Sequence, residues 1–113
     1  MMGCFYEGRI ISTAGLFLTE GIKHRHKGGL WGVYTHEDFR GQGIGKRTVK
    51  SVIDNLPDYI EQVYLNVWDE NVSAIKIYKD LGFTESGIEK NAIKWQSQYY
   101  NEVKMVKFIQ KIN

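Results

Sequence analysis

The segment Leu30–Leu56 constrains the fold of this chain more than any other part of its sequence. Apolar residues from Leu30 to Thr35 predict a buried strand, which a glycine-rich turn, Arg40–Lys46, follows. Beyond the turn, apolar residues recur at three- and four-residue spacings, which predicts an amphipathic helix that ends before Pro57. The apolar residues of this predicted helix are Ile44, Val49, Val52, Ile53 and Leu56.

The glycine-rich turn has the chemistry of a phosphate site. The first N–H groups of a helix have no partner inside the helix, and the helix dipole places partial positive charge at that end. Glycine allows the backbone to approach a ligand closely because it has no Cβ. Arg40, Lys46 and Arg47 add full positive charges. The turn therefore predicts a site for a phosphate group, and in particular for a pyrophosphate.

Spacing excludes two common kinds of phosphate loop. A Walker A loop would require glycine at position 40, which is Arg40, and serine or threonine at position 47, which is Arg47. A dinucleotide fingerprint would place its third glycine at Lys46 or at Thr48. What remains is Arg-x-x-Gly-x-Gly, although a glycine turn that only caps a helix is an alternative on this motif alone.

Length and composition predict one small domain, residues 1–113, with a substantial apolar core, since 42% of the residues are hydrophobic. The net charge of +2 gives no support for nucleic-acid binding. The basic run Lys23–Lys27 is most simply an exposed hairpin tip, although it could also help to attract an anionic ligand. No apolar run approaches the length of a membrane span, and no signal-like segment opens the sequence, so we expect no membrane association.

The single cysteine, Cys4, is interpreted as a small buried residue, and the lack of a disulfide predicts a cytoplasmic location. Cys4 and the three histidines have no recognised zinc spacing, so no metal site is expected.

Eight elements are predicted in the order strand, strand, strand, helix, strand, helix, strand, strand. This order indicates an α/β (α+β) domain whose mixed, mostly antiparallel sheet has helices packed on it. Gly15, inside the second strand, marks either a bulge or a close approach. We interpret Gly21–Gly29 as a polar connection, and Ala92–Ser97, which is ambiguous, as strand and turn. The expected ranges are 3–6, 9–18, 30–35, a helix after the glycine turn to 56, 63–67, a helix from about 74 to 81, 83–88 and 99–109.

A second motif, Asn71–Phe83, has the pattern Asn-x-x-Ala-x-x-aliphatic-Tyr-x-x-x-Gly-Phe. Together with Arg40, Gly43 and Gly45, at this separation, it resembles the GNAT superfamily of N-acetyltransferases. The resemblance covers residues 3–109 and implies the GNAT fold without its first strand and helices. It also implies transfer of an acetyl group from acetyl-CoA to the primary amine of a small molecule or an amino acid.

The resemblance implies a role for each motif residue. Tyr78 would donate a proton to the departing CoA thiolate; on spacing alone it is a core aromatic residue. Asn71 would bind the pantetheine or nearby backbone, although a helix cap is an equal alternative. The remaining residues would bind acetyl-CoA through its pantetheine arm or its pyrophosphate. They are Val33, Tyr34, Thr35, Arg40, Gly41, Gln42, Gly43, Ile44, Gly45 and Lys46. The strands near Thr35 and Val63 would have to separate to admit the ligand.

Two parts of the family pattern are incomplete. Asn66 occupies the position where some members carry a glutamate that serves as the catalytic base, and an asparagine cannot act as a base. Glu37, Glu102 or a water chain could replace that glutamate, and His36 is interpreted as structural. The elements that normally precede the first hairpin, and wall the acceptor site, are not found. A minimal enzyme, a site completed by a partner and an inactive CoA-binding module are the three alternatives. The exposed sheet edge predicts association, for which a homodimer is the simplest form.

Overall fold

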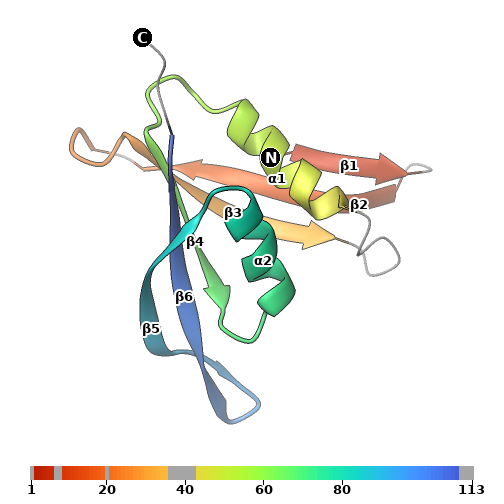
Figure 1. Ribbon diagram of the computed structural model, residues 1–113, viewed down its shortest axis with the longest axis vertical. Coiled ribbons are helices and arrows are strands. Elements are labelled where there is room, and N and C mark those ends of the chain that lie inside the picture. The colour runs from red at the N-terminus through yellow and green to blue at the C-terminus, as the bar shows by residue number, and fades with distance from the viewer. Residues whose placement is uncertain (1, 7–8, 20, 36–42, 110–113) are drawn as a thin grey trace.

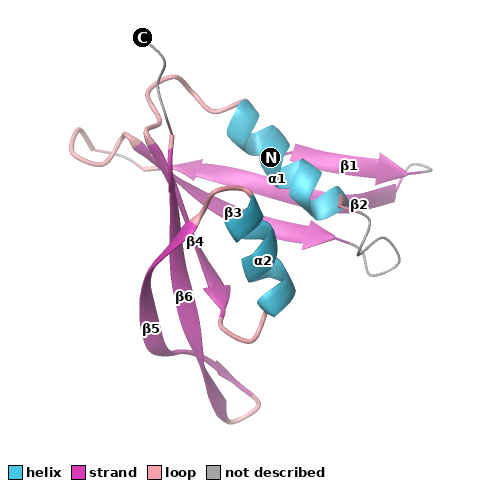
Figure 2. Ribbon diagram, in the orientation of Figure 1, coloured by secondary structure: helices cyan, strands magenta, loops and turns pink. Residues whose placement is uncertain are grey.

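The computed structural model describes residues 2–6, 9–19, 21–35 and 43–109 as a six-stranded sheet with two helices (Figures 1 and 2). The strand order is β1-β2-β3-β4-β6-β5, and only the β3–β4 pair is parallel. The mixed, mostly antiparallel sheet predicted from the sequence is therefore confirmed. The elements are β1 (Met2–Tyr6), β2 (Arg9–Leu18), β3 (Lys27–Thr35), α1 (Ile44–Asp54), β4 (Gln62–Trp68), α2 (Val72–Asp80), β5 (Thr84–Trp95) and β6 (Gln98–Phe108).

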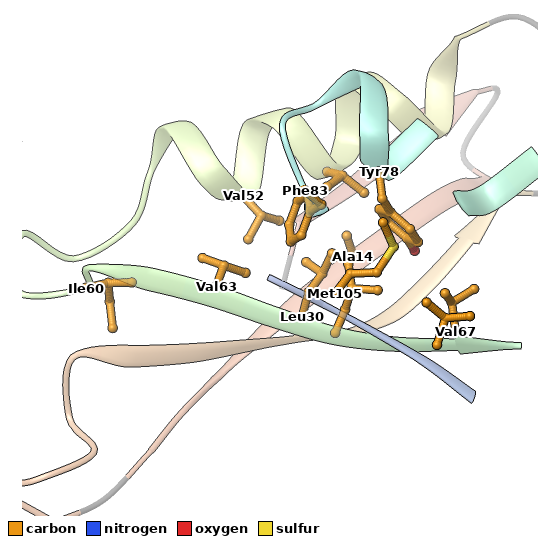
Figure 3. Packing of buried hydrophobic residues seen from close by; sticks show 12 residues of the cluster. Ala14, Leu30, Val52, Ile60, Val63, Val67, Tyr78, Phe83 and Met105 are labelled. Carbon is orange, nitrogen blue, oxygen red and sulfur yellow. The ribbon is translucent and has the colours of Figure 1, made fainter. Parts of the chain in front are cut away.

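Both helices approach the sheet from the same side, and the core lies between them and the strands (Figure 3). Helix α1 contributes Val49 and Val52, which are buried as its predicted apolar face requires. Helix α2 contributes Tyr78, whose ring meets that of Phe83 edge-on, 5.7 Å between centroids. The strands supply the rest of this core: Ala14, Leu30, Val63, Leu65, Val67, Val103 and Met105, with Ile60 from the loop before β4.

The predicted elements are all found, and most differences lie at their ends. Strand β3 begins at Lys27, so the predicted connection Gly21–Gly29 was too long. Gly29 pairs with Phe17 in this strand, and the Phe17 ring fills the space that a Cβ on Gly29 would need. The exposed part of the basic run, Lys23–Arg25, forms the β2–β3 hairpin tip, as one of the two interpretations predicted.

Gly15 marks a close approach rather than a bulge. A Cβ on Gly15 would lie 2.8 Å from the Trp31 indole, so that indole lies directly over the glycine. The bulge is on the facing strand, where the register leaves Ala14 opposite both Gly32 and Val33. Gly32 takes a φ of 62°, and the Thr13 hydroxyl donates to its carbonyl oxygen at 2.8 Å.

The β3–β4 pair opens soon after it begins. Its register runs from Lys27–Gln62 to Gly29–Tyr64, whereas β3 continues to Thr35 and β4 to Trp68. The separation predicted near Thr35 and Val63 is therefore present, although Val63 itself is still paired with Gly28. This opening positions the candidate site described next.

Candidate functional site

A cleft of about 890 Å3 occupies the opening between β3 and β4 and extends to both helices. Its lining includes the start of α1, with Gly43–Lys46, and several residues of α2 and its N-cap, among them Asn71 and Tyr78. Residues from both faces of the sheet reach it. Leu65 and Val67 belong to the covered face of β4, and Asn66 and Trp68 alternate with them on the other face. The site is therefore built at the point where the sheet itself is open.

The N-terminus of α1 supplies donors for an anion. Gly43 is the N-cap, with a φ of 75°, and no side chain caps this end. The N–H groups of Ile44, Gly45 and Lys46 have no intrahelical acceptor, because the ladder starts with Arg47 N–H donating to Gly43 at 3.1 Å. No acidic residue lies in the first turn. This end of α1 lines the cleft with exposed backbone donors and a positive dipole.

Of the other predicted residues of the turn, Arg40, Gly41 and Gln42 lie outside the described residues. Lys46 lines the cleft, and its Nζ lies 3.8 Å from Asp80 Oδ2 at the end of α2. Both side chains are nearly half exposed, so this ion pair is weak and exchangeable. Asp80 was not expected from the sequence, because a carboxylate three positions before Phe83 belongs to no phosphate motif.

The second half of β3 offers its backbone to the cleft. From Leu30 onward β3 has no partner strand among the described residues on the side that faces β4. Val33 lines the cleft and is exposed, whereas Tyr34 is exposed but does not line it. Thr35 pairs with Ser12 on the β2 side. An extended ligand arm could lie along this edge in the position of an added strand.

Tyr78 joins the core to the cleft. Its side chain is 93% buried in the interface between α2 and the sheet, and the residue also lines the cleft. Burial raises the pKa of its hydroxyl above the ordinary value of 10.0, because the protein interior disfavours the phenolate. Tyr78 is therefore a neutral proton carrier at physiological pH.

Asn71 is the N-cap of α2. Its side-chain oxygen accepts a hydrogen bond from Ala74 N–H at 3.3 Å, so the helix-cap alternative is confirmed. The residue also lines the cleft. Because capping uses only the oxygen, the side-chain amide nitrogen keeps its donors for a ligand.

No base is identified in the described part of the cleft. Asn66 lines it, as the sequence suggested for this position. Glu102 is half-buried on β6, in register with Trp68, and is not among the lining residues, while His36 and Glu37 lie outside the described residues. Two indoles that the sequence analysis did not consider, those of Trp31 and Trp68, line the same cleft. The strand pattern could have indicated them, since each alternates with buried neighbours.

Two further properties concern only the part of the chain that the structure describes. There, no three His, Cys, Asp or Glu side chains are grouped so that they could hold a metal ion. Helices α1 and α2 are both too short and too polar to cross a membrane.

Comparison with known proteins decides the family. Residues 1–83 match the model of the acetyltransferase (GNAT) family. The chain belongs to the GNAT family. Spermine/spermidine N(1)-acetyltransferase of Bacillus subtilis is 30% identical over 92 residues, which are 76% of this chain and 60% of that protein. Spermidine N(1)-acetyltransferase of Escherichia coli is 30% identical over 97 residues, 84% of this chain and 52% of that one.

Solved GNAT structures share the fold. An acetyltransferase of the family from Streptococcus pneumoniae superposes with a TM-score of 0.87 at 19% identity, over 93% of this chain and 64% of that one. A protein from Salmonella typhimurium, solved with acetyl-CoA as its cofactor, superposes with a TM-score of 0.85 at 16% identity. That match covers 96% of this chain and 64% of the other. This GNAT chain thus spans roughly three fifths of the proteins that it matches.

Proposed function

We propose that this protein is an N-acetyltransferase that moves the acetyl group of acetyl-CoA to a primary amine of a small molecule. The observation that carries the proposal is the cleft, which joins an open β3 edge, the α1 N-terminus and Tyr78 in one GNAT-type arrangement. These are the parts that the reaction requires: a phosphate site, a backbone edge for an extended arm and a proton donor.

Acetyl-CoA is proposed to lie with its pyrophosphate at the α1 N-terminus, near Gly43 and Gly45. The pantetheine arm then follows the unpaired edge of β3 around Val33, with the Asn71 amide as a further donor. When acetyl-CoA binds, Lys46 leaves its ion pair with Asp80 and pairs with a phosphate group instead. Arg40, Gly41, Gln42, Tyr34 and Thr35 complete the proposed binding set.

The reaction is a direct transfer. The neutral amine nitrogen attacks the thioester carbonyl carbon, a C–N bond forms, and the negative charge on the carbonyl oxygen is met by backbone N–H donors of β3. The C–S bond then breaks. Tyr78 gives its proton to the departing thiolate and regains one from the nitrogen that has become positively charged. The products are the N-acetylated amine and CoA.

The acceptor is proposed to be a small amine, and the names of the two relatives, which act on spermidine or spermine, favour a polyamine. A non-catalytic CoA-binding module is the alternative, and it is not favoured because those relatives are acetyltransferases. A single domain over residues 1–113, a cytoplasmic location, association as a homodimer and the lack of nucleic-acid binding stay predictions.

A thiol-release assay with acetyl-CoA tests the function. Amino acids, polyamines, aminoglycosides and peptides serve as acceptors, and CoA titration by calorimetry accompanies the assay. Release with one acceptor class supports the enzyme and gives its substrate group. CoA binding without release from any acceptor would contradict catalysis by this chain and favour the binding module.

A further inference from the structure

The lining of the cleft includes residues of the sheet face opposite the helices, Trp31 and Trp68 among them, and this end of the cleft is called its outer mouth. Trp31 of β3 and Trp68 of β4 both line the cleft. Both alternate with buried residues, Leu30 and Val67, that face the helices. The two indoles therefore belong to the outer face, on the two strands that separate.

Contacts hold the two rings in place. The Trp31 indole lies against Gly15 of β2, where a Cβ would come within 2.8 Å of it. Its side chain is still 49% exposed. Trp68 stacks on Tyr100, with 4.8 Å between centroids and 8° between planes. Because Tyr100 takes one face of the Trp68 indole, the opposite face is the one left for the cleft.

The charged side chains among the described lining residues, Lys46, Lys76 and Asp80, all belong to α1 and α2, whereas the lining residues of β3 and β4 are uncharged. Asp80, the acidic residue among the described lining residues, is engaged by Lys46 at the helix end of the cleft. On β6, Glu102 lies in register with Trp68 and Lys104 in register with Asn66, so that strand adds one charge of each sign. Indole faces attract ammonium groups and also cover alkyl chains. The Asn66 carboxamide oxygen can accept from an ammonium N–H.

We propose that Trp31 and Trp68 determine acceptor specificity, by binding the second ammonium group and the alkyl spacer of a diamine or polyamine whose other end is acetylated. The inference rests on the proposed acetyl transfer and adds which residues select the acceptor. The acceptor enters from the outer mouth while acetyl-CoA occupies the helix side. A monoamine of the same chain length lacks the charge that the indoles recognise.

The test compares 1,4-diaminobutane with n-butylamine in steady-state assays of Trp31→Leu and Trp68→Leu. Each substitution is expected to raise KM for the diamine about five-fold, the loss of one partly exposed cation–π contact, with kcat and the monoamine KM unchanged. Trp31→Phe and Trp68→Phe should restore most of the affinity. Trp95→Leu is the matched control, since Trp95 is exposed on β5 and does not line the cleft.

Two outcomes would overturn the proposal: a wild-type protein with no preference for the diamine, or a preference that survives both leucine variants. A preference for phenethylamine that the variants lose would also overturn it, because it would indicate ring stacking instead of cation binding. Gly15→Ala provides a variant that keeps both indoles but displaces Trp31, and it should raise the diamine KM in the same direction.

Failure of the proposed function is distinguishable. If no amine supports thiol release, calorimetry with CoA-saturated protein still measures whether 1,4-diaminobutane binds at Trp31 and Trp68. Diamine binding that Trp31→Leu and Trp68→Leu abolish would support the indole site without turnover, and no binding to the wild-type protein would overturn it.

Discussion

Tyr78 is the residue on which the proposed chemistry depends most directly. Its ring is part of the core, where it contacts Phe83, and the residue also lines the cleft. Phenylalanine preserves the edge-on contact with Phe83, so a Tyr78→Phe protein should fold and bind CoA like the wild type. Loss of the proton donor should lower kcat about 100-fold, the lower range for general acid catalysis.

Steady-state assays and CoA calorimetry on the same preparation check this expectation. Tyr99→Phe is the matched control, because Tyr99 is exposed on β6 and contacts Lys94 rather than the cleft. Equal turnover by the Tyr78→Phe, Tyr99→Phe and wild-type proteins would reject the acid role and leave Tyr78 as a packing residue.

The same residue makes a prediction about pH. Burial raises the pKa of Tyr78 above 10.0, so its neutral, proton-donating form persists at every pH below that value. The rate should therefore rise with pH as the acceptor amine loses its proton, with no fall attributable to Tyr78 until the pH exceeds 10.0. A pH–rate profile with a saturating small amine measures this. A decline centred near neutral pH that Tyr78→Phe removes would contradict it.

At the scale of elements, the start of α1 can be tested with two matched glycines. Gly43 and Gly21 both have positive φ, 75° and 93°, and a Cβ on either would meet no described atom within 4 Å. Valine at each position should cost about 1–2 kcal/mol of stability through the left-handed backbone. Only Gly43→Val also places a branched side chain where the pyrophosphate is proposed to lie.

CoA calorimetry should therefore detect lost affinity in Gly43→Val and normal affinity in Gly21→Val, with thermal melts confirming similar strain. Equal CoA affinity in the two variants would place the pyrophosphate elsewhere.

At the start of α2, two substitutions of Asn71 distinguish its role as the helix cap from its proposed role as a ligand donor. Asn71→Ala should cost about 1 kcal/mol, because Ala74 N–H loses its acceptor. Asn71→Ser keeps a good cap but removes the amide donors, so its melting temperature should stay near the wild-type value. If the amide nitrogen binds the pantetheine, both variants should bind CoA more weakly, as calorimetry would measure. A Ser variant with unchanged CoA affinity would leave Asn71 as a cap alone.

The sequence predicted elements well where periodicity or capping residues were strong. Both helices were placed by apolar spacing, by Asn71 and by Gly82, which has a φ of 97° just after α2. The interpretation of Ala92–Ser97 as strand and turn is confirmed, but it is the end of β5, which runs beyond the predicted range 83–88 to Trp95. The full length of β5 was missed for two reasons: it is an exposed edge strand without alternation, and the turn Gln96–Ser97 takes positive φ at both positions without the usual Asn-Gly.

The site was predictable only in part. Motif spacing identified Tyr78, Asn71 and the α1 N-terminus, all of which line the cleft. The bulge at Gly32 and the Lys46–Asp80 pair depend on register and on the approach of two helices, which a single sequence does not encode locally. The indoles of Trp31 and Trp68 were missed because neither belongs to one of the two motifs, and only the register shows that both lie beside the opening between β3 and β4.

At the scale of the whole molecule, the sheet consists of two halves, and the cleft lies where they separate. Strands β1–β3 with α1 form one side, β4–β6 with α2 form the other, and three register pairs join β3 to β4 (Figure 1). A ligand in this opening contacts both halves, so its site exists only in the folded state and its binding should stabilise the fold. Binding to the folded state alone adds about 2.7 kcal/mol when the ligand is at 100 times its Kd.

For a domain of this size that gain corresponds to a rise of about 10 °C in Tm. Thermal melts with increasing CoA should show it for the wild-type and Gly21→Val proteins, and Gly43→Val should show little change at the same concentrations. CoA, which has no acetyl group to transfer, and a diamine added together should raise Tm further than either alone, since the two are proposed to fill opposite mouths of one cleft. If the diamine instead cancels the effect of CoA, the two ligands compete, and the assignment of separate mouths is wrong.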